Sequence, residues 1–263
     1  MKLVPPSALR RSVTGRVLIV AHRGLSAEEP ENTMRSFRRA AEVGCDLIEL
    51  DVHLSRDGVP VVIHDETLDR TTSGTGLVSD RPWAELRTLD AGRGERIPAL
   101  DEVVAWAETA KIGLSVEIKQ PPPANGRPKY DEIAEKVVRI LRGARTPPGL
   151  IHSFDHPTIR EVRELWPEAT TAISYGGGTL VDPLALGRSA GASGIHPWWA
   201  WVSSEVTTVA HAAGMHVHAW GAAWPPKRED VEALVRAGID SLDANDPRPL
   251  RAILESLQTT TPP

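Results

Sequence analysis

Short apolar runs alternate with amphipathic stretches along most of the chain. The runs that predict buried strands lie at residues 17–22, 47–54, 114–119, 150–154, 170–174, 193–197, 215–220 and 239–244. Helical spacing of the apolar positions marks the stretches at 31–44, 100–110, 130–143, 157–165, 183–190, 203–213 and 229–237. Alternating strands and helices predict a parallel sheet, and eight such strands favour an α/β fold of the (β/α)8 TIM-barrel type.

One further apolar run, at 59–65, cannot be another parallel strand. Only three residues separate it from the strand before it, and a parallel crossover needs about a dozen or more. We therefore expect 47–55 and 59–65 to pair as an antiparallel hairpin after the second strand. A two-residue turn would place Asp51 opposite His64, whereas a three-residue loop would place Leu50 there. In either register His64 lies beside the second strand.

Composition and charge narrow the classes of partner. The chain has 263 residues, which is enough for one barrel, and its hydrophobic and charged fractions are those of a globular protein. The formal net charge of −5 provides no basic surface for nucleic acid and no polybasic patch for a membrane. The N-terminal segment has no continuous apolar run, so we expect no signal peptide, no membrane insertion and a cytoplasmic location. A small-molecule substrate is the expected partner, and the oligomeric state stays open.

Acidic residues occupy alternate positions on two of the predicted strands. Glu49 and Asp51 lie two residues apart on one strand, so both side chains project from the same face. Glu117 lies on the next strand and would reach the same end of the barrel. Carboxylates held together repel one another unless a cation lies between them, and oxygen ligands select Mg²⁺ or Ca²⁺, with Mn²⁺ as a further option. We therefore predict one divalent cation there.

Imidazole and basic side chains are expected around these carboxylates. His22 and Arg23 end the first strand, and His64 lies in the hairpin. Lys119 lies two residues beyond Glu117. Histidines can serve as general acid and general base because their ordinary pKa lies near neutrality. A divalent cation, Arg and Lys neutralise the charge that develops on a phosphoryl group, so the set suits phosphodiester cleavage.

The order of short sequence blocks resembles the glycerophosphodiester phosphodiesterase family. The resemblance rests on the blocks HRG (22–24), PENT (30–33), ELDV (49–52), DGVPVVIHD (57–65), LDRTT (68–72), VEIK (116–119), SFD (153–155) and SLDANDP (241–247). It extends over nearly the whole chain, from about Val17 to Pro247, and is most specific in its N-terminal part.

The resemblance implies a (β/α)8 barrel that hydrolyses a glycerophosphodiester to sn-glycerol 3-phosphate and an alcohol. It assigns metal binding to Glu49, Asp51 and Glu117, acid–base catalysis to His22 and His64, and phosphate binding to Arg23 and Lys119.

The resemblance also implies one catalytic domain spanning 1–263. Residues 66–98 are polar and weakly patterned, with a short helix expected near 82–89. The matching part of the family carries a small excursion over the barrel mouth, which corresponds to 66–113 in this chain.

The later strands depart from the family's usual pattern. After Trp220 the family reads close to W-T-V-N, whereas Gly221 follows that tryptophan here. The final strand usually resembles G-I-I-T-D-x-P, and here Asp243 and Asn245 replace its apolar and hydroxyl positions. We expect these changes to affect the choice of substrate and not the metal chemistry.

The aromatic and histidine residues of the later strands have two interpretations. Trp220 and the cluster Trp198–Trp201 either pack the core and rim or form an aromatic wall for glycerol or a choline-like cation. Trp220 is accordingly a candidate for substrate binding. His196 lies beside this cluster and has the same two interpretations, whereas we expect His152, His216 and His218 to pack in the core or at the rim.

Two other functions remain open. The first is a lysophospholipase D-type phosphodiesterase, which an exposed apolar patch at the barrel mouth would favour over a closed polar glycerol pocket. The second is a barrel without catalysis that only binds phosphodiesters. The presence of His22, His64 and the three carboxylates argues against the second.

Overall fold

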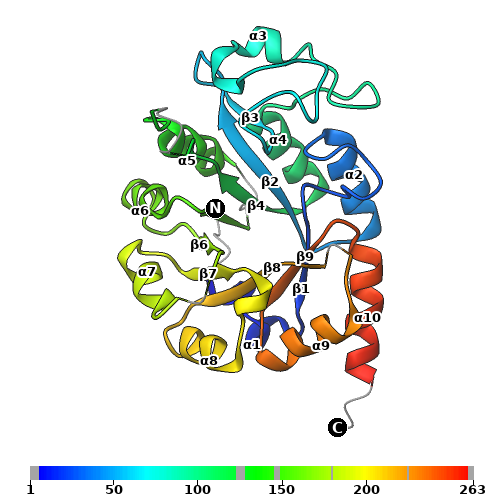
Figure 1. Cartoon of the computed structure of the whole chain (residues 1–263), viewed down its shortest axis with the longest axis vertical. Helices are drawn as coiled ribbons and strands as arrows, with labels where there is room; N and C mark the ends of the chain where they lie inside the picture. Colours follow the sequence, from blue (N-terminus) through cyan, green and yellow to red (C-terminus); the bar gives the residue numbers. More distant parts are fainter. Residues whose placement is uncertain (1–5, 123–127, 145–148, 179, 224, 260–263) are drawn as a thin grey trace.

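Eight parallel strands close into a barrel in the computed structural model, which describes residues 6–122, 128–144, 149–178, 180–223 and 225–259 (Figure 1). The strands of the ring are β1 (Leu18–Ala21), β2 (Leu47–Leu54), β4 (Gly113–Ile118), β5 (Leu150–Ser153), β6 (Thr171–Tyr175), β7 (Gly194–Pro197), β8 (His216–Ala223) and β9 (Ser241–Ala244). The ring closes because β1 pairs in parallel with both β2 and β9. The structure confirms the predicted (β/α)8 barrel.

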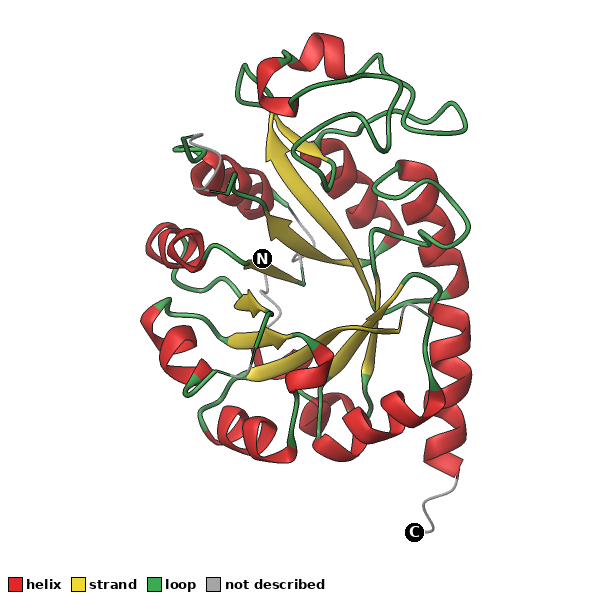
Figure 2. Ribbon diagram, in the orientation of Figure 1, coloured by secondary structure: helices red, strands yellow, loops and turns green. Residues whose placement is uncertain are grey.

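Helices surround the barrel on its outer face (Figure 2). The longer ones are α2 (Met34–Val43), α4 (Leu100–Ala110), α5 (Ile133–Gly143), α6 (His156–Leu165), α7 (Pro183–Ser189), α8 (Ser204–Ala212), α9 (Arg228–Ala237) and α10 (Pro247–Thr259). The structure adds α10, η1 (Pro6–Leu9) and α1 (Arg11–Thr14), for which the apolar pattern gave no prediction. Pro247 and Pro249 interrupt the pattern at the start of α10, although proline is tolerated in a first helical turn. No helix in the described ranges is long and apolar enough to cross a membrane.

Strand β2 shows how the barrel separates apolar from charged side chains. All eight of its residues are buried. Ile48, Leu50 and Val52 belong to the main hydrophobic core between the sheet and the helices. The alternate residues Glu49 and Asp51 therefore project into the barrel, because successive side chains of a strand point to opposite faces. The same alternation on β4 turns Glu117 inward, and Asp51 and Glu117 are register partners.

Apolar side chains close the end of the barrel interior at which the strands begin. These form a cluster of their own, made of Leu9, Leu18, Val20, Leu47, Leu150 and Ala172. Four of the five strand residues in it lie in the first half of their strands, and Val20 is the third of the four residues of β1. The buried polar residues follow toward the carboxyl ends of the strands, where functional side chains gather in this fold.

The hairpin adopts the second of the two predicted registers. Strand β3 (Pro60–Val62) pairs antiparallel with β2, and Val52 lies opposite Val62. Continued by two residues, this register places His64 opposite Leu50, as a three-residue loop requires. His64 itself follows the end of β3, and its carbonyl oxygen lies 3.0 Å from the His53 ring.

Beyond the hairpin the chain forms a lobe at the end of β2 and β3 (Figure 1). It contains η2 (Val78–Asp80) and α3 (Trp83–Leu86), the latter within the short helix expected at 82–89. A separate apolar cluster holds the lobe together, made of Val61, Ile63, Leu68, Val78, Leu86, Ala91 and Ile97. Helix α4, in contrast, contributes Leu100, Val103, Val104 and Ala107 to the main core of the barrel.

Gly194→Ala should lower the free energy of unfolding in urea by about 1–3 kcal/mol, because overpacked cores cost this much. Gly194 on β7 is the register partner of His216 on β8, and an added Cβ would overlap the His216 ring. Gly143→Ala at the end of α5 is the control, because a Cβ there meets nothing within 4 Å. Equal unfolding free energies for the two variants would contradict the close packing inferred for the interior.

Candidate active site

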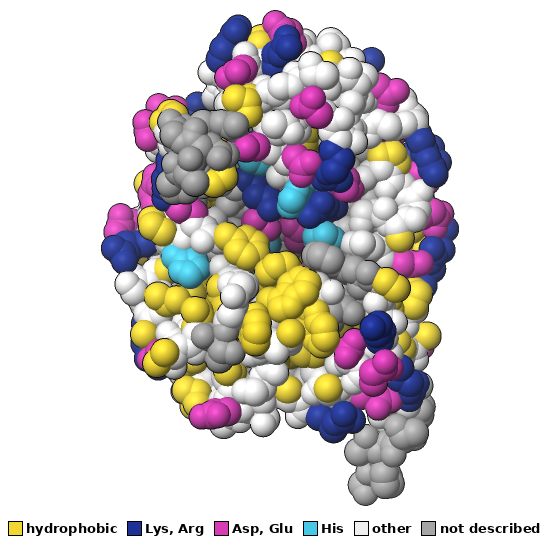
Figure 3. Space-filling view, in the orientation of Figure 1, with side chains coloured by type: hydrophobic (Ala, Val, Ile, Leu, Met, Phe, Trp, Pro, Cys, Tyr) yellow, Lys and Arg dark blue, Asp and Glu magenta, His cyan; other side chains and the backbone are white. Residues whose placement is uncertain are grey.

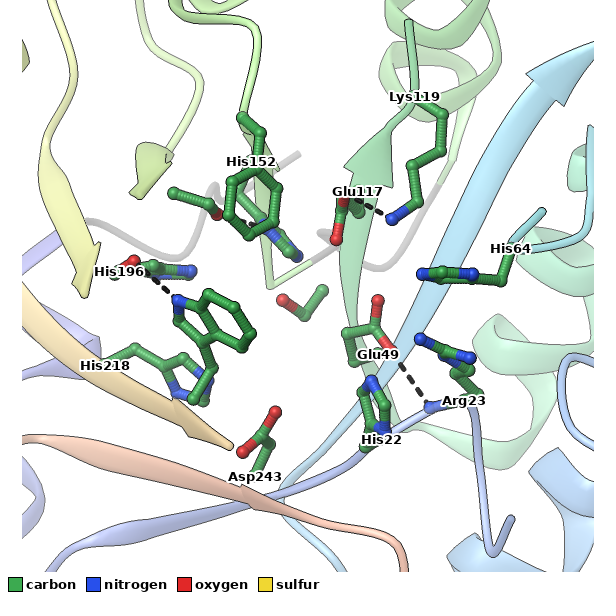
Figure 4. Close-up of a pocket in the computed structure, with 14 residues that line it drawn as sticks. His22, Arg23, Glu49, His64, Glu117, Lys119, His152, His196, His218 and Asp243 are labelled. Carbon is green, nitrogen blue, oxygen red and sulfur yellow. Dashed lines mark hydrogen bonds and ion pairs between the residues drawn. The ribbon is translucent and has the colours of Figure 1, made fainter. Parts of the chain in front are cut away.

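A pocket of about 190 Å³ opens into the barrel. Its lining includes seven of the predicted site residues, namely His22, Arg23, Glu49, His64, Glu117, Lys119 and Trp220. Asp51 lies directly behind this lining, where it forms ion pairs with Arg23 and Lys119. Figure 4 shows the charged members from β1, β2 and β4 facing one another across one side of the pocket. The structure therefore brings all eight predicted residues together.

The carboxylates differ in how they are compensated. Lys119 Nζ lies 3.0 Å from Asp51 Oδ1 and 2.5 Å from Glu117 Oε1. The Asn32 side-chain amide donates to Asp51 Oδ2 at 2.8 Å, and Arg23 Nε lies 3.4 Å from the same oxygen. Glu49 receives only the backbone N–H of Arg23, at 2.9 Å, and appears in no ion pair among the described residues. Asp51 is thus the best-compensated of the three.

These surroundings move the pKa values of the two β2 carboxyls in opposite directions. Burial raises the pKa of Glu49 well above its usual range, and the charges of Asp51 and Glu117 raise it further. Burial also opposes ionisation of Asp51, but Lys119 and Arg23 outweigh it and lower the Asp51 pKa. Ionised Glu49 therefore has no ion-pair partner among the described residues, and a bound cation could supply the missing positive charge.

The two histidines are held by different kinds of group. His22 Nδ1 lies 2.7 Å from the amide oxygen of Asn245, and burial lowers the pKa of His22 to about 3. His64 Nδ1 lies 2.6 Å from Asp65 Oδ1, a carboxylate that Arg70 also contacts. Burial lowers the His64 pKa as well, although Asp65 acts in the opposite direction.

His152 joins the site from β5, where the sequence suggested only core or rim packing. One ligand atom each of Glu49, Glu117 and His152 lie within 4.8 Å of one another, and all three residues are buried. His152 Nδ1 lies 3.0 Å from Ser174 Oγ. His152 Nε2 is buried and has no hydrogen-bond partner in the described part of the chain. Two carboxylates and an imidazole nitrogen without a partner form a donor set that fits a divalent cation.

A second layer of side chains holds the predicted residues in place. Glu31 accepts from Arg23 at 2.9 Å and from Arg70 at 2.7 Å, so it joins the β1–α2 loop to the lobe. Arg23 and Asn32 adopt left-handed backbone conformations, each with φ of 56°, which are uncommon for residues with a Cβ. The blocks HRG, PENT and LDRTT contain these residues, so a signal was present in the sequence, although the sequence assigned no role to Glu31, Asn32 and Arg70.

Comparison with known proteins identifies the family. The sequence model described as the glycerophosphoryl diester phosphodiesterase family matches residues 22–248. This chain belongs to that family. A curated relative from Caldanaerobacter subterraneus subsp. tengcongensis, a glycerophosphodiester phosphodiesterase, is 36% identical over 243 residues, which are 89% of this chain and 96% of the relative.

Solved structures agree with this assignment. A phosphodiesterase from Oleispira antarctica, in complex with the product sn-glycerol-3-phosphate, matches with a TM-score of 0.79 and 27% identity over 92% of this chain and 98% of its own. A glycerophosphodiester phosphodiesterase from Agrobacterium tumefaciens matches with a TM-score of 0.72 and 28% identity over 90% of this chain and 99% of its own. Barrel and sequence blocks thus lead to the same family.

Glu49→Gln should raise the free energy of unfolding measured in EDTA at about pH 8 and leave it unchanged at about pH 4. The pKa of Glu49 is higher in the folded protein than its usual 4.5, so ionisation of this group costs folding free energy as the pH rises above that value. Below it the carboxyl is protonated in both states and the cost disappears. Glu164→Gln, at an exposed position of α6, is the control and should show no pH-dependent gain.

Proposed function

We propose that this member of the glycerophosphoryl diester phosphodiesterase family hydrolyses glycerophosphodiesters to sn-glycerol 3-phosphate and an alcohol. The observation that supports the proposal is the pocket, in which two histidines, two cations and buried carboxylates face a common space. The Oleispira antarctica structure, a complex with sn-glycerol-3-phosphate, is in accord with this product. A cytoplasmic location stays a prediction from the sequence.

In this proposal two residues that follow the carboxyl ends of β1 and β4 bind and orient the phosphate. Arg23 and Lys119 are the cationic side chains that line the pocket, so they neutralise the non-bridging oxygens. The amide oxygen of Asn245 accepts from His22 Nδ1–H, which leaves Nε2 of the neutral ring as the proton acceptor. Burial lowers the pKa of His64, and the carboxylate of Asp65, 2.6 Å from His64 Nδ1, acts against burial by stabilising the protonated ring. His22 is therefore assigned as general base and His64 as general acid.

Glu49 and Glu117, with His152, are the residues that we propose to hold a divalent cation. The support is the buried donor set and the unpartnered Nε2 of His152. Asp51 stays a predicted ligand, although its oxygens already contact Lys119, Arg23 and Asn32. When bound, a Mg²⁺, Ca²⁺ or Mn²⁺ ion would polarise a phosphoryl oxygen and relieve the repulsion among the carboxylates.

His22→Ala and His64→Ala should each lower kcat by about 10²–10⁴-fold, the usual contribution of general acid–base catalysis. The assay follows release of glycerol 3-phosphate from glycerophosphocholine and from glycerophosphoglycerol in the presence of Mg²⁺, Ca²⁺ or Mn²⁺. His156→Ala is the control, because His156 on α6 does not line the pocket. Turnover within a few-fold of the unchanged protein would remove the substituted histidine from the mechanism. No product with any of the three metals would overturn the proposed hydrolysis and favour a barrel that only binds phosphodiesters.

Mg²⁺, Ca²⁺ or Mn²⁺ should raise the midpoint of thermal unfolding of the unchanged protein, because a ligand that binds only the folded state stabilises it. Glu117→Gln and His152→Ala should each reduce that increment, and EDTA should abolish turnover. Asp246→Asn, outside the pocket, is the control and should retain the full increment. An undiminished increment in His152→Ala would remove His152 from the ligand set.

A lysophospholipase D-type activity is a second candidate, and one observation favours it. Phe154 lines the pocket yet is 46% exposed, and Trp201, whose backbone N–H donates to the Trp198 carbonyl oxygen, is 37% exposed. Figure 3 shows an apolar surface beside the hollow that contains the charged side chains. An acyl chain could lie on that surface. The ratio of kcat/KM for lysophosphatidylcholine to that for glycerophosphocholine distinguishes the two activities.

A further inference from the structure

One side of the pocket contains none of the residues that we assign to phosphate binding. Figure 4 shows Lys119, Glu117, His64 and Arg23 on one side and His196, His218 and Asp243 on the other. The side chains of Phe154, Ser174 and Trp220 complete this second side. Because the phosphate of a diester carries two organic arms, an arm that leaves the charged side enters this one.

Asp243 is the only carboxyl on this second side of the described pocket. Its side chain comes from β9 and is 3% exposed. One oxygen accepts from the backbone N–H of Gly221 at 3.1 Å. No basic side chain of the described residues forms an ion pair with it, which is unusual because buried charges are normally paired. Burial raises the pKa of Asp243 to about 7, so a bound cation would shift this group toward the charged form.

The aromatic residues of this second side are fixed in orientation. Trp220 Nε1 donates to the carbonyl oxygens of Tyr175 and His196, at 3.2 and 3.1 Å. The Trp220 ring centroid lies 4.6 Å from that of Trp198 and 5.3 Å from that of Phe154. Trp220 and Phe154 line the pocket, and Trp198 supports Trp220 from behind.

Gly221 connects the carboxyl to this aromatic group. Its φ of 92° lies in the region that favours glycine, and a Cβ would overlap the Trp198 ring. The same residue gives Asp243 its backbone hydrogen bond. Gly221, Asp243 and the tryptophan cluster are the positions at which the sequence departs from the family pattern, and the structure joins them into one wall.

We propose that this wall recognises a positively charged alcohol arm, so that the substrates are glycerophosphodiesters with a quaternary or primary ammonium group, such as glycerophosphocholine. The inference rests on the proposed function for its kinetic test. The Asp243 carboxylate supplies the opposite charge, and the faces of Trp220 and Phe154 supply cation–π contact.

The test compares kcat/KM for glycerophosphocholine with that for the uncharged-arm substrate glycerophosphoglycerol. Asp243→Asn keeps the shape of the side chain and should lower kcat/KM for glycerophosphocholine by about 10-fold or more, mainly through KM, since a desolvated charge contact is lost. It should change glycerophosphoglycerol turnover by less than about threefold. Trp220→Leu should show the same selective loss. Asp246→Asn removes a carboxylate outside the pocket and should change neither substrate.

Equal losses of kcat/KM for both substrates would overturn the inference, because Asp243 would then act on the fold or on the glycerol arm that both substrates share. No loss for either substrate would also overturn it, because Asp243 would then contribute nothing to binding. Circular dichroism and the unfolding midpoint of Asp243→Asn identify a folding defect, and in that case Trp220→Leu decides. If the unchanged protein hydrolyses neither substrate, the proposed function fails and calorimetric titration with choline decides the inference. Binding that is lost in Asp243→Asn supports it, whereas equal or absent binding overturns it.

Discussion

Repulsion among buried carboxylates is the constraint on which the rest of the site depends. Glu49, Asp51 and Glu117 project into the barrel because they occupy alternate positions on adjacent parallel strands. Close burial of three negative charges is costly without compensation. Lys119 lies between two of them and Arg23 approaches from the end of β1. The cations that we propose to bind phosphate are therefore already ordered before any substrate enters.

That constraint extends outward to the lobe. Arg23 contacts Glu31, Glu31 contacts Arg70, and Arg70 contacts Asp65 beside His64. Arg70 belongs to the lobe that follows the hairpin, whereas Glu31 belongs to the loop after β1. One chain of alternating charges thus joins three segments around the pocket. The carboxylate beside His64 and the amide beside His22 make the two histidines chemically unlike, which a general acid and a general base require.

In the proposed assignment, one side of the pocket carries out the reaction and the other selects the substrate. The side formed by β1, β2 and β4 contains the charged groups, and its sequence blocks are the family's most specific ones. The other side, to which Phe154 and the strands β6 to β9 contribute, contains imidazoles, aromatic rings and a single carboxyl. Such a division lets substitutions on the later strands change the organic arm that is accepted while the charged groups stay in place.

The sequence by itself determined the barrel, the strands of the ring and the eight predicted residues that meet in one place. It could do so because the apolar pattern shows which side chains of a strand face inward. Once eight parallel strands form a barrel, their carboxyl ends meet at one end of it. It left the hairpin register open and gave no sign that His152 would join Glu49 and Glu117. It also did not show that Gly221 would join Asp243 to Trp198. Only the tertiary structure decided these points, because each depends on side chains from strands that are distant in the sequence and whose relative height in the barrel is set by packing.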